Sequence, residues 1–161
     1  MPVTPFHFGV GLLGKGLAPR RLSVSAFVAS QFVIDCESGY YLLIVRQWPI
    51  HRWMHTFALG SAVGLVVGVA VWAIVREDRS GAWPWISADC ALGPSLLGGF
   101  FGGVTHPFLD GIMHWDIRPL RPFLDGNPLL GLVGLGMLHL LCVLAAVLGV
   151  ALLVARRSSL P

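Results

Sequence analysis

Three ionisable residues close an apolar run at a regular spacing: His106, Asp110 and His114 lie four residues apart. The run that leads into them, residues 90–109, contains no Lys, Arg, Asp or Glu. Residues four apart share one face of an α-helix, so the spacing predicts a stripe of metal-ligand side chains. Ionisable groups in such apolar surroundings are costly to desolvate unless they pair, face a cavity or hold a metal.

Three other stretches carry groups of the same kind. T-P-F-H ends at His7, D-C-E runs from Asp35 to Glu37, and H-R-W-M-H-T runs from His51 to Thr56. Mixed imidazole and carboxylate ligation suits Zn, Mn, Fe or Ni. We therefore expect a divalent transition metal, zinc being the first choice, as one or two ions. The candidate metal ligands are the His and carboxylate residues of these four stretches: His7, Asp35, Glu37, His51, His55, His106, Asp110 and His114.

Hydrolysis is the chemistry that such a site predicts, because a bound metal lowers the pKa of water and polarises the scissile group. Glu37 is predicted to be a bridging ligand or general base, and His51 or His114 an acid that assists the leaving group. Asp35 and Glu37 point about 200° apart on a regular helix, so both can face one site only if the helix ends or kinks there. The alternative is that one of them is a metal ligand and the other only supports the site. Three arginines are predicted to hold an anionic head group: Arg52, Arg118 and Arg121.

The composition places the chain in a membrane. Of 161 residues, 55% are apolar and 12% charged, and the mean hydropathy is +0.75; soluble domains carry about 25% charged residues. We predict one integral-membrane domain over residues 1–161, with the lipid bilayer as its partner. The net charge of +3 comes from basic residues spread between apolar runs, so we expect no nucleic-acid partner.

The apolar runs predict an all-α, polytopic transmembrane bundle. Four full spans are expected at residues 22–45, 53–75, 90–113 and 129–155, with a short half-span helix at residues 5–18. Gly60, Gly64 and Gly68 recur every four residues, which favours close helix packing. The distribution of Lys and Arg favours an orientation with the site on the outer face of a bacterial inner membrane.

The order of these motifs resembles that of the YdjM-like family of bacterial inner-membrane proteins, described as metal-dependent hydrolases. That family has an early His, an Asp-x-Asp, an H-R-G-x-T-H-S stretch and an S-H-x-x-x-D. His7, Asp35, His55, His106 and Asp110 match directly, so the resemblance implies that these five are the metal ligands, and Glu37 matches the second Asp conservatively. One departure concerns His51 and His55, which are four residues apart where the family has five. Either His51 still reaches the site or it has lost the role.

Two hypotheses from different classes follow. The first is a membrane-embedded metal-dependent hydrolase of a phosphoester or other ester in a lipid or envelope substrate. The alternative is a non-enzymatic membrane protein whose His and Asp residues bind a metal or hold the helices together. A transporter is disfavoured because residues 53–75 contain no charged residue that would continue a polar path across the bilayer.

Overall fold

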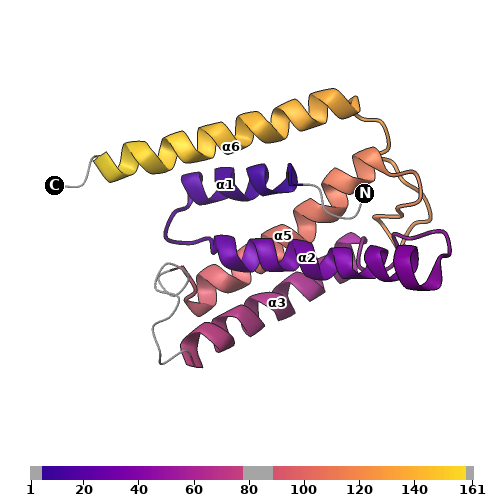
Figure 1. Ribbon diagram of the computed structural model, residues 1–161, viewed down its shortest axis with the longest axis horizontal. Coiled ribbons are helices and arrows are strands. Elements are labelled where there is room, and N and C mark those ends of the chain that lie inside the picture. Colours follow the sequence, from indigo (N-terminus) through magenta and orange to yellow (C-terminus); the bar gives the residue numbers. More distant parts are fainter. Residues whose placement is uncertain (1–4, 78–88, 159–161) are drawn as a thin grey trace.

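The computed structural model describes residues 5–77 and 89–158. Within them the chain forms five α-helices, one π-helix and no strand, which confirms the all-α prediction (Figure 1). The elements in chain order are α1 (His7–Leu17), α2 (Val24–Tyr40), η1 (Tyr41–Val45), α3 (Phe57–Glu77), α5 (Leu92–Met113) and α6 (Leu135–Ser158).

The five α-helices begin at least two residues later than the apolar runs predict, and the difference is largest for α3 and α6. α3 begins at Phe57 instead of residue 53, because the Thr56 hydroxyl donates to the Trp53 carbonyl (2.8 Å) and accepts from the N–H of Leu59 (3.1 Å). This is an N-cap, which ends the preceding turn and starts the helix. α6 begins at Leu135 instead of residue 129, because residues 129–132 form turns. Both irregular segments lie at the same end of the bundle (Figure 1).

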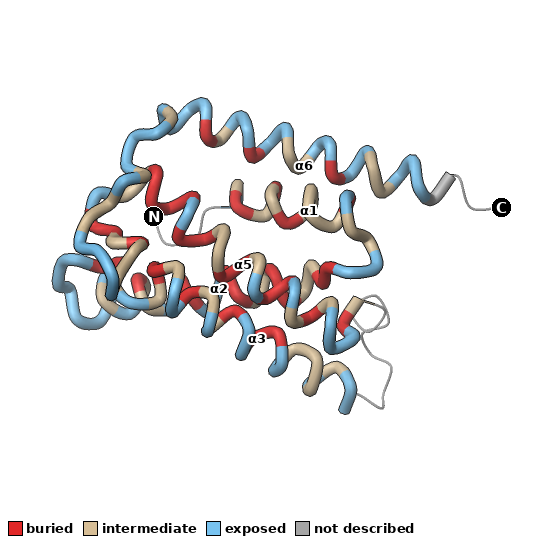
Figure 2. Tube along the Cα trace, turned by 180° about the vertical axis from the view of Figure 1, so that it is seen from behind, coloured by how far each residue is buried: buried red, intermediate tan, exposed pale blue. Residues whose placement is uncertain are grey.

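α5 packs against both α2 and α3, and it is extensively buried (Figure 2). Its backbone approaches that of α3 closely: a Cβ on Gly64 would collide with the carbonyl of Gly99, and a Cβ on Gly99 with the carbonyl of Gly64. Gly60 and Gly103 repeat this relation one turn further along. The four-residue glycine spacing is therefore confirmed as a close helix contact, of the kind small residues make in membranes.

The first and last described helices, α1 and α6, pack along each other (Figure 1). Gly9 lies against the backbone carbonyl of Cys142, and Gly16 against the backbone of Gly149. α1 makes fewer contacts with α2 and α5 than with α6. This pairing holds the N-terminal end of α1, with His7, beside the C-terminal half of α5.

Two of the described helices are long and apolar enough to cross a membrane, α3 and the Leu135–Arg156 part of α6. Only 17% of the most apolar window of each is buried in the protein, so its apolar side chains mostly face outward (Figure 2). Exposed apolar surface of this extent is unusual in a water-soluble monomer. α2 is only 17 residues long and carries Asp35 and Glu37, and α5 is rich in glycine; neither meets the same criterion.

The glycine contact between α3 and α5 gives a test of the fold. Gly99→Ala should lower the melting temperature in detergent, because overpacking a tight contact costs about 1–3 kcal/mol. Gly93→Ala is the matched control in the same helix, since a Cβ there meets nothing within 4 Å. It should be neutral or slightly stabilising because alanine favours helix more than glycine does. Equal melting temperatures for the two variants would contradict the close packing.

Candidate metal centre

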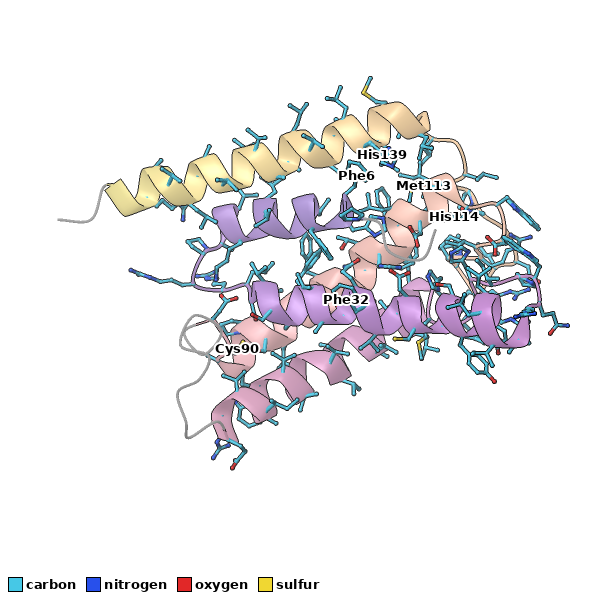
Figure 3. All side chains as sticks on the ribbon, in the orientation of Figure 1. Phe6, Phe32, Cys90, Met113, His114 and His139 are labelled. Atoms are coloured by element: carbon cyan, nitrogen blue, oxygen red, sulfur yellow. The ribbon has the colours of Figure 1, made fainter. Side chains whose placement is uncertain are left out.

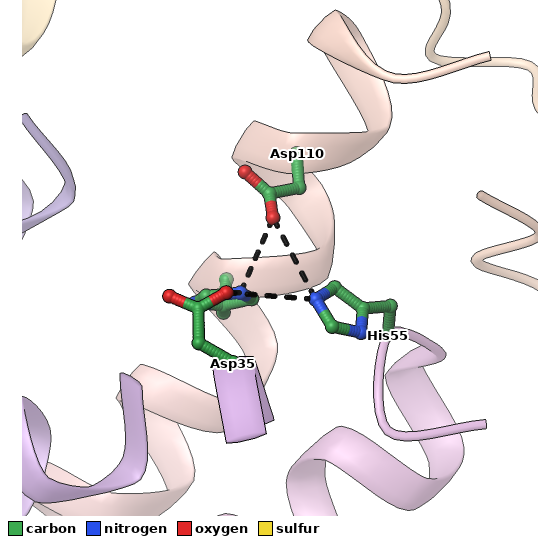
Figure 4. A group of neighbouring side chains, drawn as sticks. Asp35, His55 and Asp110 are labelled. Carbon is green, nitrogen blue, oxygen red and sulfur yellow. Dashed lines mark ion pairs between the residues drawn. The ribbon is translucent and has the colours of Figure 1, made fainter. Parts of the chain in front are cut away.

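Four buried side chains from three segments converge near the C-terminal half of α5. Asp35 comes from α2, His55 from the turn before α3, and His106 and Asp110 from successive turns of α5. Figure 4 shows Asp35, His55 and Asp110 directed toward one another. His55 and His106 have no exposed surface, and the two aspartates are 7% and 4% exposed. The burial excludes bulk water as the main partner of these charges.

The spacing of the converging atoms suits a metal ion. His106 Nε2 lies 3.4 Å from Asp35 Oδ1 and 3.2 Å from Asp110 Oδ2. His55 Nε2 lies 3.8 Å from each of the same two oxygens. Ligand atoms about 2.0–2.1 Å from a tetrahedral zinc ion are roughly 3.3–3.4 Å apart. The His106 distances are near this spacing and the His55 distances are longer, and all four atoms lie within 4.8 Å of one another, so the group could hold a metal ion.

In both His55 and His106, the Nε2 atom that faces the cluster lacks a hydrogen-bond partner, whereas the Nδ1 atom on the other side of the ring has one. Nε2 of His55 and Nε2 of His106 are buried without a hydrogen bond. His106 Nδ1 lies 2.6 Å from Gln31 Oε1, and the Gln31 amide donates to the Gly102 carbonyl (3.1 Å), which directs Oε1 toward the ring. Nδ1 of His106 therefore carries a proton, and Nε2 is the nitrogen that faces the cluster. Metal-bound histidines are oriented by the same kind of outer hydrogen bond.

Glu37 lies behind His55, outside the converging set. Its carboxylate accepts hydrogen bonds from the backbone N–H groups of Arg52, Trp53 and Met54, at 2.9–3.1 Å. Its Oε2 is also 3.4 Å from Nδ1 of His55, the ring nitrogen that faces away from Asp35 and Asp110. Glu37 therefore holds the 52–55 turn and lies against His55, outside the four converging ligand atoms. Of the two carboxylates in D-C-E, only that of Asp35 faces the cluster.

His7 stands at the edge of the cluster. Its Nε2 lies 3.2 Å from Asp110 Oδ1, its ring meets that of His106 edge to face, and it is buried. His7 Nε2 and Asp110 Oδ1 both lack a hydrogen bond in the structure. Asp110 thus directs one oxygen to His7 and the other to His55 and His106. His7 is close enough to act either as a further ligand beside Asp110 or as a hydrogen-bond partner that orients the Asp110 carboxylate.

A second group lies next to the first and contains a residue that the sequence analysis missed. Asp116 Oδ1 accepts from Nδ1 of His51 at 2.9 Å, and Asp116 Oδ2 accepts from the backbone N–H groups of Ile50 and His51. The His51 ring stacks on His114 (4.4 Å between centroids) and meets His55 edge to face (4.7 Å). His51, His114 and Asp116 also lie close enough together to hold an ion. The hydrogen bond to Asp116 instead gives His51 the arrangement of an oriented acid or base.

The charge states in this second group follow from its surroundings. Burial raises the pKa of Asp116, but the hydrogen bond and charge of His51 and the two backbone N–H groups outweigh it and lower the pKa to about 2. Burial lowers the pKa of the His114 imidazole; Asp110 opposes this and His51 adds to it. Asp116 is therefore ionised and His114 mostly neutral at pH 7. A fixed carboxylate keeps the proton of His51 on Nδ1 and leaves Nε2 as the reactive nitrogen.

The three predicted head-group arginines line one pocket. It has a volume of ≈ 550 Å³, and His51 and Asp116 are part of its wall. Arg52 packs over the Tyr41 ring (3.8 Å to its centroid), Arg118 donates to the carbonyls of Trp115 and Ile117, and Arg121 pairs with Asp125. Small-molecule sites commonly have volumes of about 300–1,000 Å³. We call this space the arginine pocket.

No family model, curated protein or solved structure matches this chain. The site must therefore be interpreted from its geometry. Gln31 and Asp116, which support the histidines, have only weak signals in the sequence. Gln31 precedes Asp35 by four residues and so shares its helix face, and Asp116 follows His114 by two.

Metal content tests the cluster directly. Protein purified in detergent should contain at least one divalent transition metal ion per chain by mass spectrometry, and His55→Ala/Asp110→Ala should contain none. His139→Ala is the matched control, because it removes an imidazole that is stacked on Phe6 and lies outside the cluster. Gln31→Met should keep the ligands but weaken binding roughly 10–100-fold. Equal metal content in the double variant and the wild type would contradict the assignment.

The Asp116 interaction predicts a pH dependence of stability. A folded pKa of about 2 against an ordinary 3.8 means that the ionised carboxylate stabilises the fold above pH 4. This contribution is about 2 kcal/mol, and it is lost as the pH falls from 4 to 2. The difference in unfolding free energy between wild type and Asp116→Asn should therefore shrink over that range. Tryptophan fluorescence in nonionic detergent measures it, and a difference that stays constant from pH 5 to pH 2 would oppose the assignment.

Proposed function

We propose that this protein is a membrane-embedded, metal-dependent hydrolase of a phosphoester or other ester in a lipid or envelope substrate. The observation that carries the proposal is the buried set of Asp35, His55, His106 and Asp110, whose inward nitrogens have no hydrogen-bond partner. Next to it are an oriented His51 and the arginine pocket. A metal site, an acid and an anion site are the three parts that hydrolysis of an anionic ester requires.

The membrane setting belongs to the proposal. α3 and α6 can span by length and composition, and we propose that α2 with η1, and α5, cross beside them to give four spans, with α1 as a sheltered half-span. The stacked pair Trp48 and Trp115 and the exposed Trp53 lie at the end that holds the site. Tryptophans are enriched at membrane interfaces, so this end is placed at head-group level. The charge distribution favours the outer face of a bacterial inner membrane.

Different residues would bind the metal, donate the proton and bind the anionic group. Asp35, His55, His106 and Asp110 would hold a divalent ion, zinc by the ligand spacing, with His7 or the second group available to a further ion. Such an ion would lower the pKa of a bound water and polarise the scissile group. Asp116 accepts from Nδ1 of His51, and the ring, when it carries a proton on both nitrogens, can give the Nε2 proton to the departing oxygen. The arginines orient the anionic group through charge-assisted hydrogen bonds.

A resemblance of motif order supports the same proposal. His7, Asp35, His55, His106 and Asp110, the residues that match the YdjM-like pattern, all lie in or beside the cluster. His51, whose spacing departs from that pattern, lies outside the four ligands and beside Asp116. We infer that His51 acts on the substrate and not on the metal. The shorter spacing is consistent with this different role.

Turnover separates the proposal from its alternative, a metal-binding or structural membrane protein. In nanodiscs the metal-loaded protein should release p-nitrophenol from p-nitrophenyl phosphate or p-nitrophenyl acetate, and chelation should abolish this until zinc is restored. His51→Asn should keep its metal and melting temperature but lose activity by about 10²-fold or more, the usual share of a general acid. A metal-loaded wild type with no turnover of either ester would favour the alternative.

A further inference from the structure

A second pocket, distinct from the arginine pocket, opens beside the metal centre and is almost wholly apolar. It has a volume of ≈ 570 Å³, and its wall includes Phe6, Ile112, Met113, His114, Val133 and His139. Figure 3 shows Phe6, Met113, His114 and His139 gathered where α1 begins, α5 ends and α6 starts. We call it the chain pocket. Its size is in the usual range for small-molecule sites.

The chain pocket is joined to the metal centre by sequence neighbours. Phe6 directly precedes His7, and Ile112 follows Asp110 by two residues. Its wall is therefore built from the same two backbone segments that position His7 and Asp110. The pocket and the metal centre thus share these backbone segments, although the side chain of Ile112 points to another side of α5 than that of Asp110.

A pair of stacked rings lies between the chain pocket and the arginine pocket. His114 lines the chain pocket, His51 lines the arginine pocket, and their centroids are 4.4 Å apart. One molecule could thus place a hydrocarbon on the His114 side and an anionic group on the His51 side. The junction between its two parts would lie at His51, the proposed acid.

We propose that the two pockets together bind one amphiphile, a hydrocarbon chain esterified to phosphate, with the chain against Phe6 and His139 and the phosphate among Arg52, Arg118 and Arg121. This rests on the proposed function and names its substrate class. Charge complementarity supports this occupant, because three arginines outnumber the single carboxylate of Asp116 in the wall of the arginine pocket, whereas the chain pocket is mostly apolar. The tryptophans around the arginine pocket place the phosphate at head-group level, where a membrane lipid carries it.

Photocrosslinking in nanodiscs tests the proposal. The probe is a long-chain alkyl phosphate with a diazirine at the end of the chain, and the control probe is the alcohol of the same chain. Mass spectrometry of the phosphate probe should map its crosslinks to residues 5–6, 112–114 and 130–139, with the alcohol spread over the outward faces of α3 and α6. Arg118→Gln should reduce the pocket crosslinks about tenfold, because it removes a charged hydrogen-bond donor. Arg20→Gln, at the opposite end of the bundle, should leave them unchanged.

A second variant fills the chain pocket itself. Gly134 lines it, and a Cβ there meets nothing within 4 Å, so Gly134→Phe adds bulk without a backbone clash. It should reduce the pocket crosslinks about tenfold. Gly136→Phe is the matched control, since that glycine is equally free of neighbours and lies outside the pocket wall. The two phenylalanine variants should have equal melting temperatures.

Two results would overturn the proposal: a phosphate probe that labels the lipid-facing helices as the alcohol does, or pocket crosslinks that Gly134→Phe and Arg118→Gln leave unchanged. Metal content and ester turnover, measured in the same samples, report on the proposed function separately. Specific crosslinks in a protein without metal would support the lipid site and reject the hydrolase. Bound metal and ester turnover with no specific crosslinks would keep the hydrolase and reject the lipid phosphate.

Discussion

The constraint on which the structure depends is the cost of burying imidazoles and carboxylates in an apolar bundle. An isolated buried charge is very unfavourable, so each such group must be paired, hydrogen-bonded or bound to a metal. The outer atoms of His55 and His106 are paired with Glu37 and Gln31. Their inner atoms make no hydrogen bond and lie 3.2–3.8 Å from the carboxylates of Asp35 and Asp110. A divalent cation is the partner that would satisfy all four inner groups at once.

Close packing of glycines makes this convergence possible. Because the backbones of α3 and α5 touch at Gly64 and Gly99, the turn before α3 is brought within reach of the C-terminal half of α5. His55 on that turn then meets His106 without leaving a gap that water would fill. Larger residues at the crossing would separate the two histidines. The site therefore depends on the glycine spacing as well as on its ligands.

The sequence predicted those features of the fold and site that depend on residues close together in the chain, and it did not predict those that depend on contacts between distant segments. The spacing of His106 and Asp110 within one helix and the apolar runs were enough to predict a helical bundle with a His and Asp site. The start of α3 and the role of Glu37 were not, because both depend on how residues 52–56 turn back onto α2. Asp116 was missed for the same reason: its partners Ile50 and His51 lie 66 and 65 residues away in the chain. Side chains that act across helices carry little signal in one sequence.

The pairing of α1 with α6 has a consequence for biosynthesis. α1 leaves the ribosome before its main packing partner, the last described helix, which is about 130 residues later in the sequence. Before α6 has been made, Phe6 therefore lacks the His139 ring on which it stacks. The chain pocket then also lacks the wall that residues at the start of α6 form. A nascent chain without α6 would thus hold His7 only by its contacts with α5, beside an incomplete chain pocket.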